Sequence, residues 1–478
     1  MSRLHSPQWR KSVSVASLAL ATLLAGCATP PHKGDLRPIS APESFAASQS
    51  FAAPRADWPS DEWWTAFGDS QLDALVQEGL AGATDLRVAE ARFQRARALV
   101  TQSRADLLPS VTANGQGGVA QQSERYLFPK GLAPRGWQDY GQASLNLNWE
   151  LDFWGRNRAA LAAAKSDAEA AGAEAAAARL AVSASITSAY ADLAGLYAER
   201  DAAQKAVEVR GQTRELITGR MKQGLENEGA VDRAASAMAT AQGELGTIDE
   251  AITLTRNRIA ALMGAGPDRG LSIVRPTVAV SNVPGLPANL PAELIGRRPD
   301  IIAARLRAEA AASRIKQARA AFYPNINLAG LIGLQALGID NIFKSGSDFG
   351  SAGPAISLPI FDGGRLRGQY RGAEADYAAA VAQYDGALVQ ALREVADAAT
   401  SQRALDERLE RAEAAERGAQ AAWTVANNRY RGGLSTYLEV LTAEDALISA
   451  RRTVASLQTR AFTLDVALIR ALGGGFRS

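Results

Sequence analysis

The chain has 478 residues, and its 52 Lys and Arg residues nearly balance its 50 Asp and Glu residues. This balance gives no basic surface for nucleic acid, and the single cysteine excludes a disulfide bond within the chain. The two histidines, His5 and His32, lie near the N-terminus, so the rest of the chain cannot build a site on histidine. We therefore expect no nucleic-acid partner, no catalysis by histidine and no metal site built on histidine or cysteine, whereas chemistry based on carboxylates alone stays open at this point.

Residues 1–26 have the pattern of an export signal. Basic residues precede an apolar run, Val13 to Ala25, whose 13 residues are fewer than the roughly 20 needed to span a bilayer. The run leads to Cys27, and the small residues before this cysteine resemble a bacterial lipobox. We expect a covalent lipid on Cys27 and no other cofactor, so that the mature chain is anchored in lipid. Removal of the signal takes three basic residues and leaves 49 against 50 acidic ones.

Residues 27–60 are rich in Pro, Ala and Ser, which predicts an extended tether from the lipid. The aromatic cluster Trp63, Trp64 and Phe67 follows the tether, and we interpret it as ordinary hydrophobic core. Apolar residues from Leu72 to Leu80 then recur at helical spacing.

A helix is expected over residues 85–108 because Pro109 disfavours the helical conformation in the residue before it. After Pro109 the hydrophobic period changes to two, which predicts strands in two hairpins, 110–151 and 325–361. Such strands have one polar and one apolar face. The polar positions, which we expect to face a water-filled lumen, are Thr112, Asn114, Gln116, Ser144, Asn146, Asn148, Asn325, Asn327 and Ser357.

Each hairpin is followed by a long Ala-rich stretch without proline. Apolar residues from Val182 to Leu196 step by four and three, which predicts a coiled-coil seam. We expect antiparallel coiled coils over 156–263 and 365–473, separated by a Pro- and Gly-rich linker at 266–291. In each coiled coil a glycine turn precedes a second helix of roughly 35–40 residues.

The two halves of the chain repeat one another. Residues Asp85–Thr112 match Asp300–Asn327 at an offset of 215, whereas the offset after the hairpins is 209. The repeats are 61–265 and 292–473, and the first has six extra residues between its strands. The predicted fold is mainly α with a small β part: long coiled coils that form an α-barrel, and four strands that contribute to a transmembrane β-barrel.

Four strands cannot close a membrane barrel alone, since known barrels begin at about eight strands. An open sheet edge in lipid would leave backbone groups unsatisfied, so closure requires several chains. Two chains supply eight strands, whose interior is filled by side chains, and three supply twelve, which leave a lumen. A conduit therefore favours a homotrimer.

Five motifs together resemble the outer membrane factor family of TolC-like channels, in its lipoprotein branch. The resemblance covers the chain from about residue 58 onward. The motifs, in chain order, are Trp63-Trp64, Phe67, Asp69 and Leu72; Arg297 to Ile301; Leu358 to Arg365; Gly433-Leu434; and Tyr437 to Leu441.

The resemblance implies a homotrimer that joins a barrel in outer-membrane lipid to a helical tunnel in the periplasm. It also implies two partners, a periplasmic adaptor and an inner-membrane pump of the resistance-nodulation-division type. Transport of small toxic compounds through this route contributes to antibiotic resistance, and the channel has no catalytic activity.

The resemblance further implies a periplasmic gate. Tyr430 stands at the position of a gating tyrosine and Glu439 at that of one carboxylate in a ring. This chain departs from the pattern at Thr442, Ser435 and Ala230, where relatives have a second carboxylate, an arginine and an acidic residue. An equally good interpretation of Glu439 is a solvated carboxylate at a helix end with no role in a gate.

Two alternatives to drug efflux remain open. The same fold serves as an outer-membrane conduit for type I protein secretion, fed by a different inner-membrane transporter. A lipid-anchored periplasmic coiled-coil scaffold without a pore would explain the long helices, but it leaves the alternation at 110–116 and 144–149 unexplained.

Overall fold

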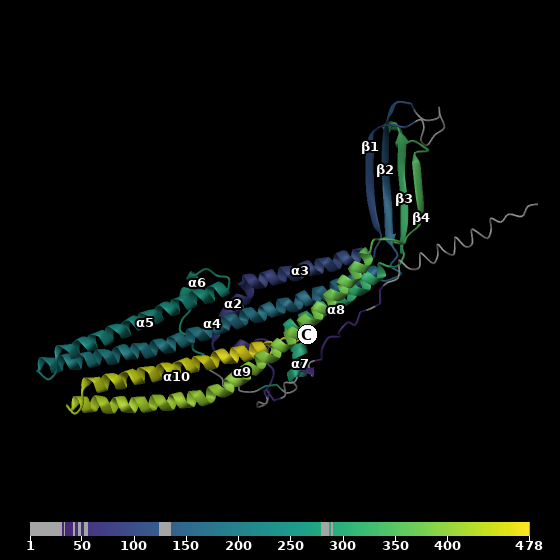
Figure 1. Cartoon of the computed structure of the whole chain (residues 1–478). Helices are drawn as coiled ribbons and strands as arrows, with labels where there is room; N and C mark the ends of the chain where they lie inside the picture. Colours follow the sequence, from purple (N-terminus) through teal and green to yellow (C-terminus); the bar gives the residue numbers. More distant parts are fainter. Residues whose placement is uncertain are drawn as a thin grey trace, which may run out of the picture. The chain divides into compact units, whose positions relative to one another are not determined.

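The computed structural model describes residues 31–32, 34–41, 44–45, 49–51, 56–123, 135–278, 286–287 and 290–477 (Figure 1). The predicted signal peptide and lipidation site at Cys27 lie outside these residues. The chain divides into two compact units. One consists of Met1–Ile39, Gln94–Ala170 and Ala304–Tyr384, and the other of Ser40–Phe93, Ala171–Ala303 and Asp385–Ser478.

The first unit contains a single antiparallel sheet of four strands in the order β1-β2-β3-β4 (Figure 1). The strands are longer than the alternating segments that predicted them, because pairing continues beyond the strictly alternating residues toward the loops. Their bounds are β1 Ser110–Gln121, β2 Trp137–Glu150, β3 Asn325–Leu337 and β4 Asp348–Ser357. Since β2 pairs with β3, the two halves of the sequence meet in the middle of the sheet.

Carboxylates after the hairpins begin the two longest helices, α4 (Arg156–Lys222) and α9 (Arg365–Arg431), which each have 67 residues. Asp152 accepts hydrogen bonds from the backbone N–H groups of Asn157 at 3.2 Å and Arg158 at 2.8 Å. Asp362 accepts from those of Gly364 at 3.0 Å and Leu366 at 2.8 Å. These bonds satisfy first-turn donors that have no partner inside a helix.

The other helices follow the duplication. Two 22-residue helices precede the hairpins, and the first ends three residues earlier than residue 108. Helices of 35 residues follow α4 and α9. Among the described residues no helix combines the length and the apolar character needed to cross a bilayer. The bounds are η2 Trp63–Phe67, α2 Ser70–Gly82, α3 Thr84–Ala105, α5 Glu228–Leu262, α6 Asp268–Leu271, α7 Leu290–Arg297, α8 Pro299–Ala320 and α10 Tyr437–Ala471.

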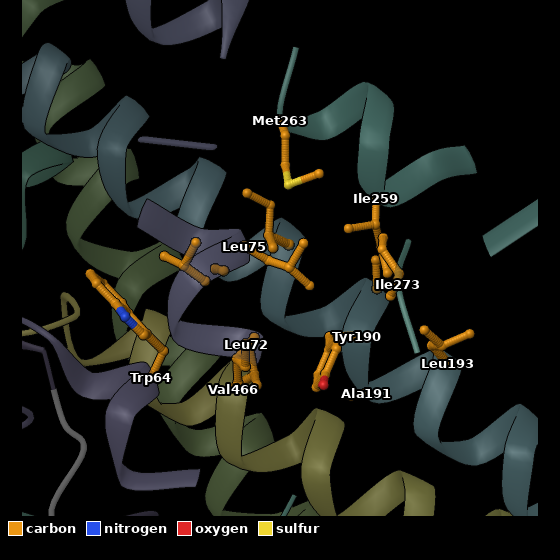
Figure 2. Packing of buried hydrophobic residues seen from close by; sticks show 14 of the residues in the cluster. Trp64, Leu72, Leu75, Tyr190, Ala191, Leu193, Ile259, Met263, Ile273 and Val466 are labelled. Atoms are coloured by element: carbon orange, nitrogen blue, oxygen red, sulfur yellow. The ribbon is translucent and has the colours of Figure 1, made fainter. Parts of the chain in front are cut away.

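The core of the second unit lies where η2 and α2 pack against α4, α5 and α10 (Figure 2). Trp63, Trp64 and Phe67 are almost completely buried, which confirms their interpretation as ordinary core. The Phe67 ring lies 4.5 Å from the ring of Phe462 on α10. The seam residues of α4 pack here as well: Val182, Ile186, Ala189 and Leu193 are buried, and Leu196 is partly buried against them.

Part of the predicted linker is held against the core. It contains the short helix α6, and Asp69 accepts hydrogen bonds from the backbone N–H of Thr277 at 2.7 Å and the hydroxyl of Tyr190 at 2.8 Å. Despite its burial, these bonds lower the pKa of Asp69. The stretch after α6 is therefore fixed by polar contacts that its Pro- and Gly-rich composition does not reveal.

Two glycines allow the long antiparallel helix pairs, α4 with α5 and α9 with α10, to end in close contact with the ends of α2 and α7. Gly264, after α5, and Gly473, after α10, both have positive φ, at 74° and 95°. A Cβ atom on Gly264 would clash with the carbonyl oxygen of Gly82, and one on Gly473 with that of Arg297. These pairs are equivalent in the two repeats, so the duplication is preserved in the packing.

Candidate functional site

The strand register gathers every predicted lumen residue on one face of the sheet. Residues directly opposite one another in antiparallel strands lie on the same face. Thr112 pairs with Asn146, and Asn325 pairs with Ser357, while Glu150 pairs with Asn327. With the alternation along each strand, this places on one polar face Thr112, Asn114, Gln116, Ser144, Asn146, Asn148, Asn325, Asn327 and Ser357.

Hydrogen bonds connect some of the polar side chains within this face. The Gln116 Nε2 atom donates to the Tyr140 hydroxyl at 2.9 Å, and Asn146 Nδ2 donates to Ser144 Oγ at 3.4 Å. Ser144 is buried within the sheet, whereas Asn114 is exposed. The face is thus a wettable surface with a few internal hydrogen bonds.

The opposite face of the sheet is apolar and carries a tryptophan toward each end of β2. Trp149 Nε1 donates a hydrogen bond to the carbonyl oxygen of Leu107 at 3.0 Å, which fixes the indole near the end of the strand. Trp137 begins the strand and is 70% exposed. The large apolar side chains exposed on this face are Val111, Val119, Trp137, Leu145, Trp149, Ile332 and Ile356.

The second candidate region consists of the two turns that join α4 to α5 and α9 to α10. Gly224 and Gly433 adopt φ angles of 74° and 73° in these turns, a conformation that a side chain disfavours. Asn227 caps α5 by accepting a hydrogen bond from the Ala230 N–H at 2.9 Å. Thr436, the N-cap of α10, makes no such side-chain bond.

Tyr430 is buried beside these turns, with only 1% of its surface exposed. Its hydroxyl donates a hydrogen bond to Glu226 Oε1 at 3.0 Å, and the Arg220 guanidinium lies 4.7 Å from its ring centroid. Arg220 Nη1 also donates to the Tyr430 carbonyl oxygen at 3.3 Å. Burial, and then the Glu226 carboxylate, raise the pKa of Tyr430 to about 12, so its hydroxyl keeps the proton that it donates.

Glu439 lies apart from this arrangement. It is exposed in the first turn of α10, where the helix dipole favours a negative charge. The partner of Tyr430 is Glu226, from the other half of the chain. Thr442 donates its hydroxyl proton to the Leu438 carbonyl oxygen at 2.9 Å, and the Ser435 Oγ atom is buried without a partner among the described residues.

A buried ionic cluster links α4 to α10 farther from the two turns than Tyr430 lies. Arg210, 7% exposed, donates from Nη1 to Glu444 Oε2 at 3.2 Å and from Nη2 to Asp445. Thr213 donates to the second oxygen of Glu444 at 3.3 Å. Burial raises the pKa of Glu444, although the positive charge of Arg210 opposes that change.

Sequence reasoning missed Glu226, Arg210 and Glu444 because the repeat gives no warning of them. Glu226 is equivalent to Ser435 in the second half, and Glu444 is equivalent to Ala235 in the first. Their partners lie 204 and 234 positions away along the chain.

The described residues contain no cluster of three or more His, Cys, Asp or Glu side chains that could hold a metal ion. The predicted lipid on Cys27 falls outside these residues, so its surroundings are not part of the site geometry. What the sheet and the turns offer chemically is a two-faced surface and a set of hydrogen bonds between helices.

Comparison with known proteins gives a consistent result. A sequence model described as "Outer membrane efflux protein" matches residues 75–265 and 290–474. The crystal structure of the outer membrane protein VceC from Vibrio cholerae shares 46% identity and a TM-score of 0.83, covering 88% of this chain and all of that one.

Two curated relatives extend the comparison. The "Fusaric acid resistance protein FusA" of Burkholderia cepacia is 35% identical over 78% of this chain and 71% of its own length. The "Multidrug resistance outer membrane protein MdtP" of Shigella flexneri is 30% identical, and the match covers 96% of each chain. The chain therefore belongs to the outer membrane efflux protein family, and it is an outer-membrane efflux channel rather than an enzyme.

Proposed function

We propose that the protein is a lipid-anchored homotrimer that forms the outer-membrane channel of a tripartite efflux system. It passively conducts small toxic compounds or drugs from a periplasmic adaptor and an inner-membrane pump of the resistance-nodulation-division type. The names of its relatives, which refer to fusaric acid and multidrug resistance, support this class of cargo. The lipoprotein branch is supported by Cys27 and the residues before it.

The observation that supports a conduit most strongly is the two-faced sheet with two unpaired edges. Among the strands that the structure describes, in the order β1-β2-β3-β4, β1 and β4 each pair on one side only. Inside a bilayer their free N–H and C=O groups need partners, and a neighbouring copy supplies them. Three copies give twelve strands, with the polar face around a lumen and the apolar face toward lipid.

The apolar face also matches the thickness of a membrane. Trp137 and Trp149 lie at the two ends of β2, twelve positions apart. That separation is about 40 Å along a strand, or about 28 Å across the bilayer at a tilt of about 45°. Aromatic residues gather at both interfaces of outer-membrane barrels, at a spacing of roughly 25–30 Å. The two tryptophans therefore support a membrane position for this sheet.

We further propose that the Tyr430–Glu226 hydrogen bond holds the periplasmic end of the tunnel closed. It joins the turn after α4 to the end of α9, so separation of these helices would break it. Glu439 is exposed where a ring of carboxylates from three chains could select cations. The proposed first repeat, 61–265, contains the matched range 75–265, and the proposed second repeat, 292–473, lies within the matched range 290–474.

Cysteine labelling on neighbouring residues of β2 tests the conduit. Asn146 belongs to the polar face and Leu145 to the apolar face. In intact cells, a charged, membrane-impermeant maleimide should label Asn146→Cys, because a water-filled lumen admits it from outside. Leu145→Cys should stay unlabelled until detergent removes the lipid.

The same experiment can contradict the proposal. Equal labelling of both variants in intact cells would place both faces in water, as in a scaffold without a pore. Labelling of Leu145→Cys alone would reverse the two faces. The reagent enters the lumen from outside the cell, so a closed periplasmic gate does not affect the result.

A further inference from the structure

The second compact unit contains a small cavity with an unusual set of lining residues. Its volume is about 170 Å³, and it lies between the segment 56–67 and helices α9 and α10. Trp63, Phe67 and Leu472 form part of its apolar wall. None of the residues that line it is basic, and two are acidic, Asp57 and Asp465.

Asp465 presents a partly buried carboxylate to this cavity. Its Oδ1 atom accepts a hydrogen bond from Gln402 Nε2 at 2.9 Å. No Lys or Arg of the described part of the chain forms an ion pair with it. Burial, partly opposed by Gln402, and the nearby Asp406 charge raise its pKa to about 6. At neutral pH the carboxylate is therefore mostly ionised, and among the described residues this partly buried charge has no cation beside it.

The apolar wall suits an organic cation better than a metal ion or a bare ammonium. The faces of Trp63 and Phe67 can attract a positive charge as well as contact hydrocarbon. A dry cavity of about 150 Å³ is large enough to hold benzene. A carboxylate beside such a wall combines a charge partner with a surface for an apolar body.

We propose that this cavity binds a small organic cation, an ammonium group on an aromatic or apolar body the size of benzylamine. The ammonium pairs with Asp465, and the body packs against Trp63, Phe67 and Leu472. The cavity shares no lining residue with the polar face of the sheet or with Tyr430 and its partners, and the proposal does not rest on the proposed transport function. A bound cation contacts both the N-terminal segment and α10, so it stabilises their association.

Binding can be measured on the full-length protein in detergent with benzylammonium chloride as the probe. Isothermal titration calorimetry should show saturable binding, and the thermal unfolding midpoint should rise with the probe concentration. Benzyl alcohol, of similar shape but neutral, should bind at least about tenfold more weakly because it lacks the charge-assisted hydrogen bond.

The key variant is Asp465→Asn, which keeps the shape of the side chain and an acceptor for Gln402. It should weaken benzylammonium binding by about ten- to a hundredfold and leave benzyl alcohol binding unchanged. Asp397→Asn, on the exposed side of α9 and outside the cavity lining, is the matched control and should bind as the wild type does.

Affinity should also fall as the pH drops through about 6, because protonation of Asp465 removes the charge that holds the cation. The other groups that face it are Asp57 from the N-terminal segment and Gln402 and Asp406 from α9.

Three results would overturn the proposal. The first is wild-type affinity in Asp465→Asn. The second concerns Arg55, which precedes the lining residue Ala56 in the sequence: binding that appears only after Arg55→Ala would mean that the chain supplies its own cation. The third is a wild-type protein that does not bind the probe, together with an Asp465→Asn variant whose oligomer dissociates. This result would mean that Asp465 pairs with a basic side chain of a second copy.

Discussion

At the helix tips, two neighbouring tyrosines differ in their hydrogen bonding. The rings of Tyr430 and Tyr437 lie 6.3 Å apart in one buried cluster. The Tyr430 hydroxyl donates to Glu226, whereas the Tyr437 hydroxyl is buried without a partner among the described residues. Substitutions at these two positions can therefore separate the effect of the hydrogen bond from that of the ring.

Tyr430→Phe should open the channel more often. It removes a hydrogen bond to a carboxylate, and in the proposed gate such a bond would stabilise the closed arrangement by about 1.5–3 kcal/mol in each chain. The expected result is a higher mean conductance in planar bilayers and greater sensitivity of cells to large antibiotics. Tyr437→Phe keeps the ring and removes no hydrogen bond, so its conductance should equal that of the wild type. If both variants conduct equally, the Tyr430 hydroxyl does not hold the tip closed.

The Arg210–Glu444 pair should determine how stability depends on pH. The pKa of Glu444 is raised in the folded chain, so the folded state binds its proton more tightly than the unfolded state does. The free energy of unfolding therefore falls as the pH rises above the ordinary pKa of 4.5. Arg210→Met should steepen this fall and cost about 3–5 kcal/mol near neutral pH, because it leaves a buried carboxylate unpaired.

Thermal unfolding between pH 4 and pH 8 measures this effect. The double variant Arg210→Met with Glu444→Leu removes both charges, so it should recover much of the lost stability and show a weaker pH dependence. A double variant as unstable as Arg210→Met alone would show that packing, and not the unpaired charge, is responsible.

At the scale of elements, the glycines after α5 and α10 determine how closely the helix hairpins approach their neighbours. Gly264→Ala should destabilise the protein by about 1–2 kcal/mol from its positive φ and by about 1–3 kcal/mol more from the clash with the Gly82 carbonyl oxygen. Gly224 is the matched control, since its φ of 74° equals that of Gly264 but its Cβ would meet nothing within 4 Å. Unfolding midpoints of the two alanine variants should therefore differ, and equal midpoints would remove the close approach as a cause.

The strands and long helices were predictable because each depends on a periodic pattern. Alternation at 110–116 specified both a strand and its polar face, and the register agrees with the face assigned to Asn146 and Ser357. The burial of Trp64 also followed from its aromatic neighbours. Local patterns of this kind are stored in consecutive residues, so one sequence is enough to read them.

The contacts at the tips were not predictable in the same way. Tyr430 was identified only by resemblance, and its partner Glu226 has no periodic neighbour or matching residue in the second repeat. The cavity at Asp465 was also missed, because its carboxylate lies among apolar positions of α10 and its partner Gln402 belongs to α9. Such pairings depend on which helices lie side by side, and spacing along one helix does not contain that information.

At the scale of the whole molecule, the free edges of the sheet predict how copies associate. Cysteines at Thr112 on β1 and Ser351 on β4, with a long flexible bismaleimide, should join separate chains because no strand of the described chain pairs beyond β1 or β4. Denaturing gels should show two- and three-chain products and none larger.

Cysteines at Asn146 and Leu331 form the control pair. They lie opposite one another on β2 and β3 of the same chain, so the reagent should join them without a change in chain number. Products of four or more chains from the edge pair would contradict a closed ring of three, and an absence of interchain products would contradict association through these edges.

The pairing of β2 with β3 has a consequence for cells that make both normal and mutant chains, which then assemble together. Within a chain the first repeat meets the second, and in the proposed trimer β4 of one chain meets β1 of the next, which again joins a second repeat to a first. Such a head-to-tail contact uses two different surfaces, and a ring forms only if every chain offers both. A chain with a damaged β4 edge and an intact β1 edge would still enter the ring and leave it unclosed, so one faulty subunit in three would disable the whole. Alleles of this kind should be dominant over the normal gene.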